Sequence, residues 1–150
     1  MERCPKNLLS KILGSLLIIF LHTSQLFAET IIIGNKKTTP DELRMVDMRL
    51  IFLGEKKAWE DNISIKLALY TRRNILEEFT NDFTKKPLFL FQANWKRRIF
   101  TGRNKAPKGF GSEKELIQYV SITEGAIGFV TPAADIKNVK IIKIVREGEK

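Results

Sequence analysis

Apolar residues alternate with other residues in one part of the chain and recur at helical spacing in several others. Every second residue from Ile63 to Leu69 is isoleucine or leucine, and this alternation predicts a half-buried β-strand over Ile63–Tyr70. Three further apolar runs rich in β-branched residues predict strands of their own: Thr30–Ile33, Gly125–Thr131 and Val139–Val145.

The first predicted helix lies between the strands at 30–33 and 63–70. Thr39 is the expected N-cap, Pro40 suits the first helical position, and Glu42 completes a capping box with Thr39. Leucine and valine then recur at helical spacing until Gly54, which marks the expected end of the helix.

Further helices are predicted in the second half of the chain. One starts at Asn74, has a phenylalanine-rich face and stops before Pro87, where the next helix begins. A capping box of Ser112 and Glu115 starts the last helix, which runs to Thr123. Because strands alternate with helices, we predict an α/β domain with a central mixed sheet flanked by helices.

The N-terminal segment has the composition of a secretory signal peptide. Basic residues precede a short apolar run at Ile12–Leu21, and a polar stretch follows up to Ala28. The apolar run is too short for a comfortable membrane span. We therefore expect residues 1–28 to be cleaved on export to the periplasm, leaving residues 29–150 as one domain. The alternative is an uncleaved anchor, because Leu26 is large for its place before the cut.

The residues that follow the expected cleavage site exclude several kinds of chemistry. The only cysteine is Cys4 and the only histidine is His22, so the expected domain holds neither thiol nor imidazole. Cysteine nucleophiles, histidine-based triads and zinc sites built on these side chains are thereby excluded. No carboxylate pair stands out as catalytic, and we expect no enzyme, no metal and no cofactor. The domain retains 23 basic and 16 acidic residues, a formal charge of +7.

A set of motifs resembles, in order and spacing, the substrate-binding proteins of phosphate ABC transporters. The motifs are IFLGEKKAW at Ile51–Trp59, WKRRIFTGR at Trp95–Arg103, the proline at Pro107, and EGAIGFV at Glu124–Val130. The similarity covers nearly all of residues 30–145 and is closer to the short, single-domain members of that periplasmic-binding-protein-like superfamily. The resemblance implies an α/β binding-protein fold and an exported, non-enzymatic protein related to phosphate capture, with an ABC permease or an envelope protein as partner.

Departures from the family pattern leave two functions open. The full-length proteins hold their anion in a cleft between two domains, whereas residues 29–150 supply about one domain. The family's Ser-Gly-Thr type of turn is replaced by Arg73, Asn74 and Ile75, and a family arginine falls on Leu69. The resemblance thus implies a protein that engages a small phosphate-like anion, or an accessory module of an envelope complex with a degenerate ligand site.

Candidate anion-binding residues lie at two predicted helix starts. The first turn of a helix carries unpaired N–H groups and the positive end of the helix dipole, so it attracts anions. Arginine adds forked hydrogen bonds to phosphate. The alternative at both places is that the polar side chains only cap their own helices. The candidates are Thr71, Arg72, Arg73 and Asn74 at one start, and Thr38 and Thr39 at the other.

Basic residues are concentrated in the stretch 96–108, which contains no acidic residue. This stretch is either an ordinary solvated surface or a surface that faces an anionic membrane or polysaccharide. We expect no nucleic-acid partner, because an exported domain rarely meets one and because Trp95 and Phe100 suit an apolar helix face better than a stacking platform. The basic residues are Lys96, Arg97, Arg98, Arg103, Lys105 and Lys108.

Overall fold

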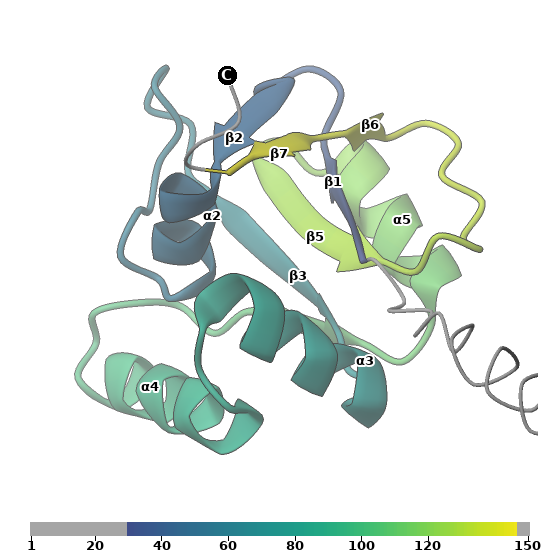
Figure 1. Cartoon of the computed structure of the whole chain (residues 1–150). Helices are drawn as coiled ribbons and strands as arrows, with labels where there is room; N and C mark the ends of the chain where they lie inside the picture. Colours follow the sequence, from purple (N-terminus) through teal and green to yellow (C-terminus); the bar gives the residue numbers. More distant parts are fainter. Residues whose placement is uncertain (1–29, 147–150) are drawn as a thin grey trace, which may run out of the picture.

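A mixed sheet runs through the middle of the protein in the computed structural model, which describes residues 30–146 (Figure 1). The order of its strands is β4-β3-β5-β1-β6. β3 is parallel to β4 and β5, whereas β1 is antiparallel to β5 and β6. The predicted α/β class with a central mixed sheet is confirmed. The strands are β1 (Ile31–Gly34), β3 (Lys66–Tyr70), β4 (Lys108–Phe110), β5 (Ala126–Val130) and β6 (Lys140–Ile141).

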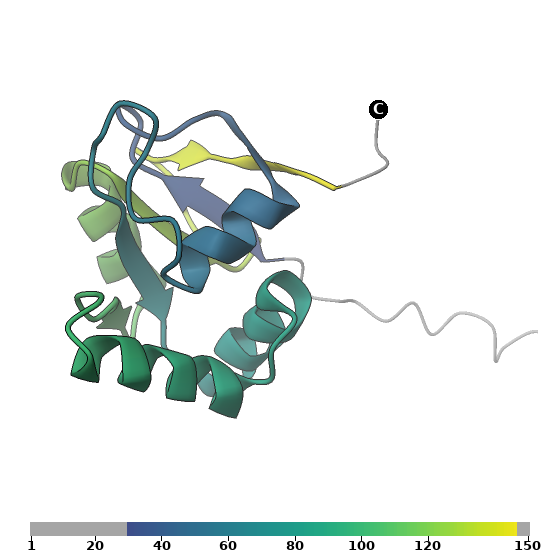
Figure 2. The ribbon, with the colours of Figure 1, turned by 90° about the vertical axis from the view of Figure 1, so that its left-hand side faces the viewer.

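Helices cover both faces of this sheet (Figure 2). On one face, the ring of Phe129 from β5 stacks on Phe79 at 3.8 Å between centroids and meets the edge of Phe52. On the other face, Gly128, the residue before Phe129 in β5, lies against Leu116 of α5. The fully buried phenylalanines thus fix α2 and α3 over the first face. The helices are α2 (Met45–Phe52), α3 (Arg73–Phe79), which continues into the π-helical turn η1 (Thr80–Thr84), α4 (Leu88–Phe100) and α5 (Glu113–Ile122).

The expected signal peptide, residues 1–28, lies outside the described residues. Within residues 30–146, no helix combines the length and the apolar character needed to cross a membrane.

The helix start predicted at Thr39 is wrong. Residues Glu42–Arg44 form strand β2, which pairs in parallel with β7 (Lys143–Val145), and α2 begins only at Met45. The Thr39 hydroxyl donates to the carbonyl oxygen of Asn35 at 2.7 Å, so it stabilises the turn after β1 rather than a helix end. Pairing with a strand about a hundred residues away outweighs the local capping signal here.

Other predicted boundaries differ in ways that have local causes. The strand expected from Ile63 begins at Lys66, because Ser64 forms an isolated bridge with Ala58 instead. The run Val139–Val145 divides into β6 and β7, which belong to different sheets, since Ile142 turns inward and donates its N–H to Ile32. Strand β4 was not predicted; it begins at Lys108, the last residue of the basic stretch 96–108.

Helix caps also differ from their predictions. Asn74 lies inside the first turn of α3, whose N-cap is Arg72. Ser112 is the N-cap residue of α5, as predicted, but its side chain makes no capping hydrogen bond. The neighbouring acid Glu113 instead accepts the backbone N–H of Thr131, which ties the start of α5 to the end of β5. The predicted capping box with Glu115 is therefore wrong.

Candidate functional site

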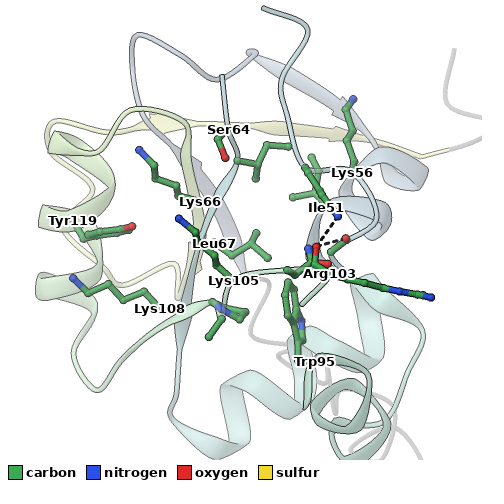
Figure 3. Close-up of a pocket in the computed structure, with 16 residues that line it drawn as sticks. Ile51, Lys56, Ser64, Lys66, Leu67, Trp95, Arg103, Lys105, Lys108 and Tyr119 are labelled. Carbon is green, nitrogen blue, oxygen red and sulfur yellow. Dashed lines mark hydrogen bonds between the residues drawn. The ribbon is translucent and has the colours of Figure 1, made fainter. Parts of the chain in front are cut away.

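A pocket of about 460 Å³ opens beside the first half of β3 (Figure 3). Its position follows from the register of the sheet, because β4 pairs only with Ala68–Tyr70 of β3. The chain before β4, residues 103–107, lies across the space that this short pairing leaves beside Lys66 and Leu67. Trp95 of α4 and Tyr119 of α5 form part of the lining.

The lining of this pocket is strongly basic. It contains six cationic side chains and no carboxylate, and we call it the basic pocket. In Figure 3, Lys66 and Lys108 lie on the side of Tyr119, whereas Arg103 and Lys56 lie on the side of Trp95. Like charges around one hollow focus a positive potential into it. The six cations are Lys56, Lys57, Lys66, Arg103, Lys105 and Lys108.

Five of these six cations have no ion-pair partner among residues 30–146, and Lys56 is the exception. Lys66, Arg103 and Lys105 make no ion pair in the described chain, so their charges are available to a ligand. Lys108 instead lies over the ring of Tyr119, with its Nζ 4.6 Å from the centroid. Lys56 is 3.4 Å from a carboxylate oxygen of Asp47.

Asp47 does not line the basic pocket, but it pairs with Lys56 and so neutralises the charge of one lining cation. The hydrogen bond from Arg44, at 2.7 Å, lowers the pKa of the Asp47 carboxyl below its ordinary value, and Lys56 lowers it further. Asp47 is therefore ionised at neutral pH and holds Lys56 toward α2. The positive charge that no carboxylate pairs therefore lies away from Asp47, on exposed side chains such as Lys66 and Lys105.

The backbone carbonyl of Gly54 anchors the wall of the basic pocket. It accepts hydrogen bonds from the Asn104 side-chain amide at 3.0 Å and from Arg98 at 3.2 Å. The Trp95 indole N–H donates to the carbonyl of Phe52 at 3.0 Å and closes the same corner. Because these donors come from α4 and from the loop that follows it, these hydrogen bonds hold the loop at residues 103–107 against the end of α2.

The residues Thr71–Asn74 lie at the far end of β3 and do not line the basic pocket. Thr71 donates both its N–H and its hydroxyl to the carbonyl of Phe110, each at 2.9 Å. Arg72, Arg73 and Asn74 are exposed at the start of α3. Thr71 and Arg73 line a separate hollow of about 360 Å³ that also contains Glu77. Anion binding at this helix start stays a prediction.

Thr38 and Thr39 belong to a hydrogen-bonded turn at the end of β1. Thr38 donates its hydroxyl to Asn35 and accepts the N–H of Gly125 at 2.6 Å. Asn35 is buried and donates its amide to the last carbonyls of α5, Val120 and Ser121. Both threonine hydroxyls are thus engaged within the fold.

The sheet register separates the two predicted clusters. Gly34 at the end of β1 pairs with Ile127, and Lys66 at the start of β3 pairs with Ala126. Residues that follow β1 therefore lie at the end of the sheet where β3 begins, and Thr71 lies at the opposite end. The two candidate clusters cannot act on one ligand. Thr38 and Thr39 line a hollow of mixed charge whose acids are Glu42, Asp47, Glu60 and Asp61.

The sequence indicated only part of the basic pocket. Arg103, Lys105 and Lys108 belong to the predicted basic stretch, whereas Lys66 and Lys57 come from distant segments and were missed. Lys66 could have been identified from the sequence, because it lies between two apolar positions of the alternating strand and its side chain must therefore point away from the core.

Comparison with known proteins places this fold. No protein-family model and no curated protein sequence matches the chain. Solved structures do match. A possible phosphate binding protein from Planctomyces limnophilus is similar with a TM-score of 0.53 at 16% identity, over 78% of this chain and 41% of that one. PstS from Borrelia burgdorferi matches with a TM-score of 0.52 at 13% identity, over 77% of this chain and 46% of that one.

An ABC-type phosphate transport receptor from Vibrio cholerae matches with a TM-score of 0.50 at 15% identity, over 77% of this chain and 45% of that one. The present chain therefore spans less than half the length of these solved proteins. At such identities the likeness concerns the fold, and it confirms the resemblance given by the sequence motifs. The fold of this chain is similar to that of these solved phosphate-binding and phosphate-transport proteins.

Proposed function

We propose that the protein binds a phosphate-like anion in the basic pocket and does not catalyse a reaction. The observation that carries the proposal is the collection of six cationic side chains, without any carboxylate, around one hollow of about 460 Å³. A hollow of this size is in the range of small-molecule sites. It accommodates a phosphate group that is free or that is carried by a small organic molecule.

The lining offers the hydrogen bonds that such an anion needs. Lys66 and Lys105 supply ammonium donors, and Arg103 supplies a guanidinium that suits two phosphate oxygens at once. Ser64 and Asn104 add neutral donors at the same hollow. The solved proteins of the same fold include a phosphate transport receptor, which favours phosphate over other anions as the first ligand to test.

The side chains around the basic pocket favour binding over catalysis. No carboxylate, imidazole or thiol is among the residues that line it, so the usual general bases are missing from its wall. Within residues 30–146 no group of three His, Cys, Asp or Glu side chains could hold a metal ion. We further propose that the protein acts after export to the periplasm, on the pattern of residues 1–28, and that an ABC permease receives its ligand.

A second candidate function takes account of how much of the matched proteins this chain covers. The solved proteins of this fold are more than twice as long as the part that matches here. Most of the cations that line the basic pocket are exposed in the described residues, and the alternative is that the protein serves as an accessory module of an envelope complex. In that case the protein has no small ligand of its own, and no anion stabilises it specifically.

A thermal-shift titration tests the binding function. An anion that binds only the folded state stabilises it by mass action. At ten times its Kd, the free energy of unfolding rises by about 1.4 kcal/mol, which raises the melting temperature of a domain of this size by roughly 5 °C. Inorganic phosphate, pyrophosphate and a simple phosphate monoester are titrated against chloride at equal ionic strength. A rise with the monoester alone identifies an organic phosphate as the ligand.

Variants of matched charge locate the site. Lys66→Gln with Lys105→Gln removes two free cations of the basic pocket and is expected to abolish the shift. Arg72→Gln with Arg73→Gln removes the same charge from the start of α3 and is expected to leave the shift unchanged. Loss of the shift only in the arginine variant would move the site to α3. No phosphate-specific shift in the parent protein would favour the accessory module.

A further inference from the structure

The outer face of α4 carries large apolar side chains in contact with solvent. The inner face is buried through Phe91 and Trp95, which are 2% and 6% exposed. On the outer face, Phe89 is 67% exposed and Phe100 is 93% exposed. These two phenylalanines are eleven positions apart, close to three full turns, so they lie in one stripe about 16 Å long. We call this stripe, with the basic residues beside it, the α4 outer face.

Cations lie between and beside the two phenylalanines. Lys96 occupies the same stripe, one turn before Phe100, and Arg97 is next to it; both side chains are exposed. Neither residue makes an ion pair within residues 30–146. The chain contains no acidic residue anywhere from Phe83 to Ser112, so the positive field of this face is not neutralised by its own segment.

We propose that the α4 outer face docks the protein on an anionic phospholipid bilayer. In this arrangement Phe89 and Phe100 enter the interface between headgroups and acyl chains, and Lys96 and Arg97 contact the phosphates of the lipid headgroups. A helix that lies along the membrane surface has this combination of aromatic and basic residues. Figure 2 shows α4 at the outside of the fold, with its long side free of other elements.

The arrangement fits lipid better than an acidic protein surface. A protein interface is built around one desolvated apolar centre. Here the two rings stand at the two ends of the helix with charges between them, and each ring can enter a fluid surface separately. Long cationic side chains also extend readily toward headgroups while their methylenes remain in apolar surroundings.

A tryptophan at position 100 gives a local test in the full chain. The native tryptophans, Trp59 and Trp95, are each 6% exposed, so Phe100→Trp adds a single solvent-exposed indole. Vesicles of phosphatidylcholine with phosphatidylglycerol are expected to shift its emission to shorter wavelength, and brominated lipids are expected to quench it. Pure phosphatidylcholine vesicles are expected to do neither at the same lipid concentration. Because the probe is local, contacts made by other parts of the chain do not produce this signal.

Matched variants on the Phe100→Trp background test the role of the cations. Lys96→Gln with Arg97→Gln is expected to weaken vesicle binding roughly 30-fold, about fivefold for each cation. Lys36→Gln with Lys37→Gln removes the same charge from an exposed turn away from α4 and is expected to change binding less than threefold. Circular dichroism checks that the melting curves stay alike.

Three results would overturn the proposal: an emission that anionic vesicles leave unchanged, an equal response to neutral vesicles, or equal losses in the two charge variants. Phosphate binding in the basic pocket is measured separately without lipid, so failure of either idea leaves the other standing.

Discussion

Replacing Gly125 by alanine tests how the turn between α5 and β5 supports the basic pocket. Gly125 has a φ of +75°, a region that residues with a Cβ rarely adopt. A Cβ at this position would strike the carbonyl oxygen of Ser64 and lie 3.2 Å from its carbonyl carbon. Ser64 is part of the lining of the basic pocket, so the collision pushes directly on the wall of the candidate site.

The expected loss has two parts. The left-handed conformation costs a non-glycine residue about 1–2 kcal/mol. Moving Ser64 away also strains the hydrogen bonds that converge on Gly125: its carbonyl accepts the Trp59 indole N–H and the Lys66 N–H, each at 3.1 Å. Loss of these two bonds adds about 1–3 kcal/mol. Gly125→Ala should therefore destabilise the protein by roughly 2–5 kcal/mol.

Gly102 supplies a matched control. It has a similar φ of +66°, but a Cβ there would meet no atom within 4 Å. Gly102→Ala therefore carries only the conformational cost, about 1–2 kcal/mol. The difference between the two variants isolates the collision with Ser64 and the hydrogen bonds that depend on Gly125.

Urea unfolding, followed by circular dichroism, measures both variants. With an m-value of about 2 kcal/mol/M, the midpoint should fall by roughly 1–2.5 M for Gly125→Ala and by less than about 1 M for Gly102→Ala. A loss for Gly125→Ala that does not exceed the loss for Gly102→Ala would refute the reasoning, because the contact with Ser64 would then carry no free energy. Phosphate affinity should also fall in Gly125→Ala and not in Gly102→Ala.

Two further predictions concern the packing of the core and the loss of stability at acidic pH. Phe79→Ala should lower the free energy of unfolding by about 3–5 kcal/mol, because Phe79 is fully buried and contacts the rings of Phe52, Phe83 and Phe129. Urea unfolding measures this loss, and a loss below about 1 kcal/mol would contradict the described packing. The lowered pKa of Asp47 means that its carboxylate stabilises the fold at pH values above the ordinary value of 3.8, and that this contribution disappears as the pH falls through the lower, folded-state pKa. Asp47→Asn should therefore lose less stability than the parent protein between pH 5 and the acid limit, in urea unfolding at successive pH values with about 0.1 M salt; equal pH slopes would disprove this role.

The elements that the sequence predicted well are those whose burial pattern is local. The strand ending at Tyr70 was predicted because its alternating leucines face the core, and α4 because Phe91 and Trp95 recur at helical spacing. β2 was missed because its partner β7 lies about a hundred residues away. No local pattern records that pairing, and the capping signal at Thr39 indicated a helix instead.

The candidate site was less predictable for the same physical reason. The basic stretch is visible in the sequence, but predicting a pocket also requires knowing which segment of the fold lies opposite this stretch. Lys66 faces Lys105 and Arg103 only because β4 pairs with β3 from Ala68 onward and leaves the earlier part of β3 uncovered. Register of this kind depends on the whole sheet, and a single sequence does not reveal it.

The place of β1 in the sheet sets the order in which the chain can fold. β1 is the first described strand, yet its partners on both sides, β5 and β6, lie about a hundred residues later. During synthesis, the isoleucines of β1 therefore remain without a strand partner until β5, near the end of the described chain, has been made. Contacts of such long sequence separation slow folding and leave apolar segments exposed to aggregation in the meantime. Because β5 precedes β6 in the chain, β1 can gain its first partner from β5 and its second only when β6 follows.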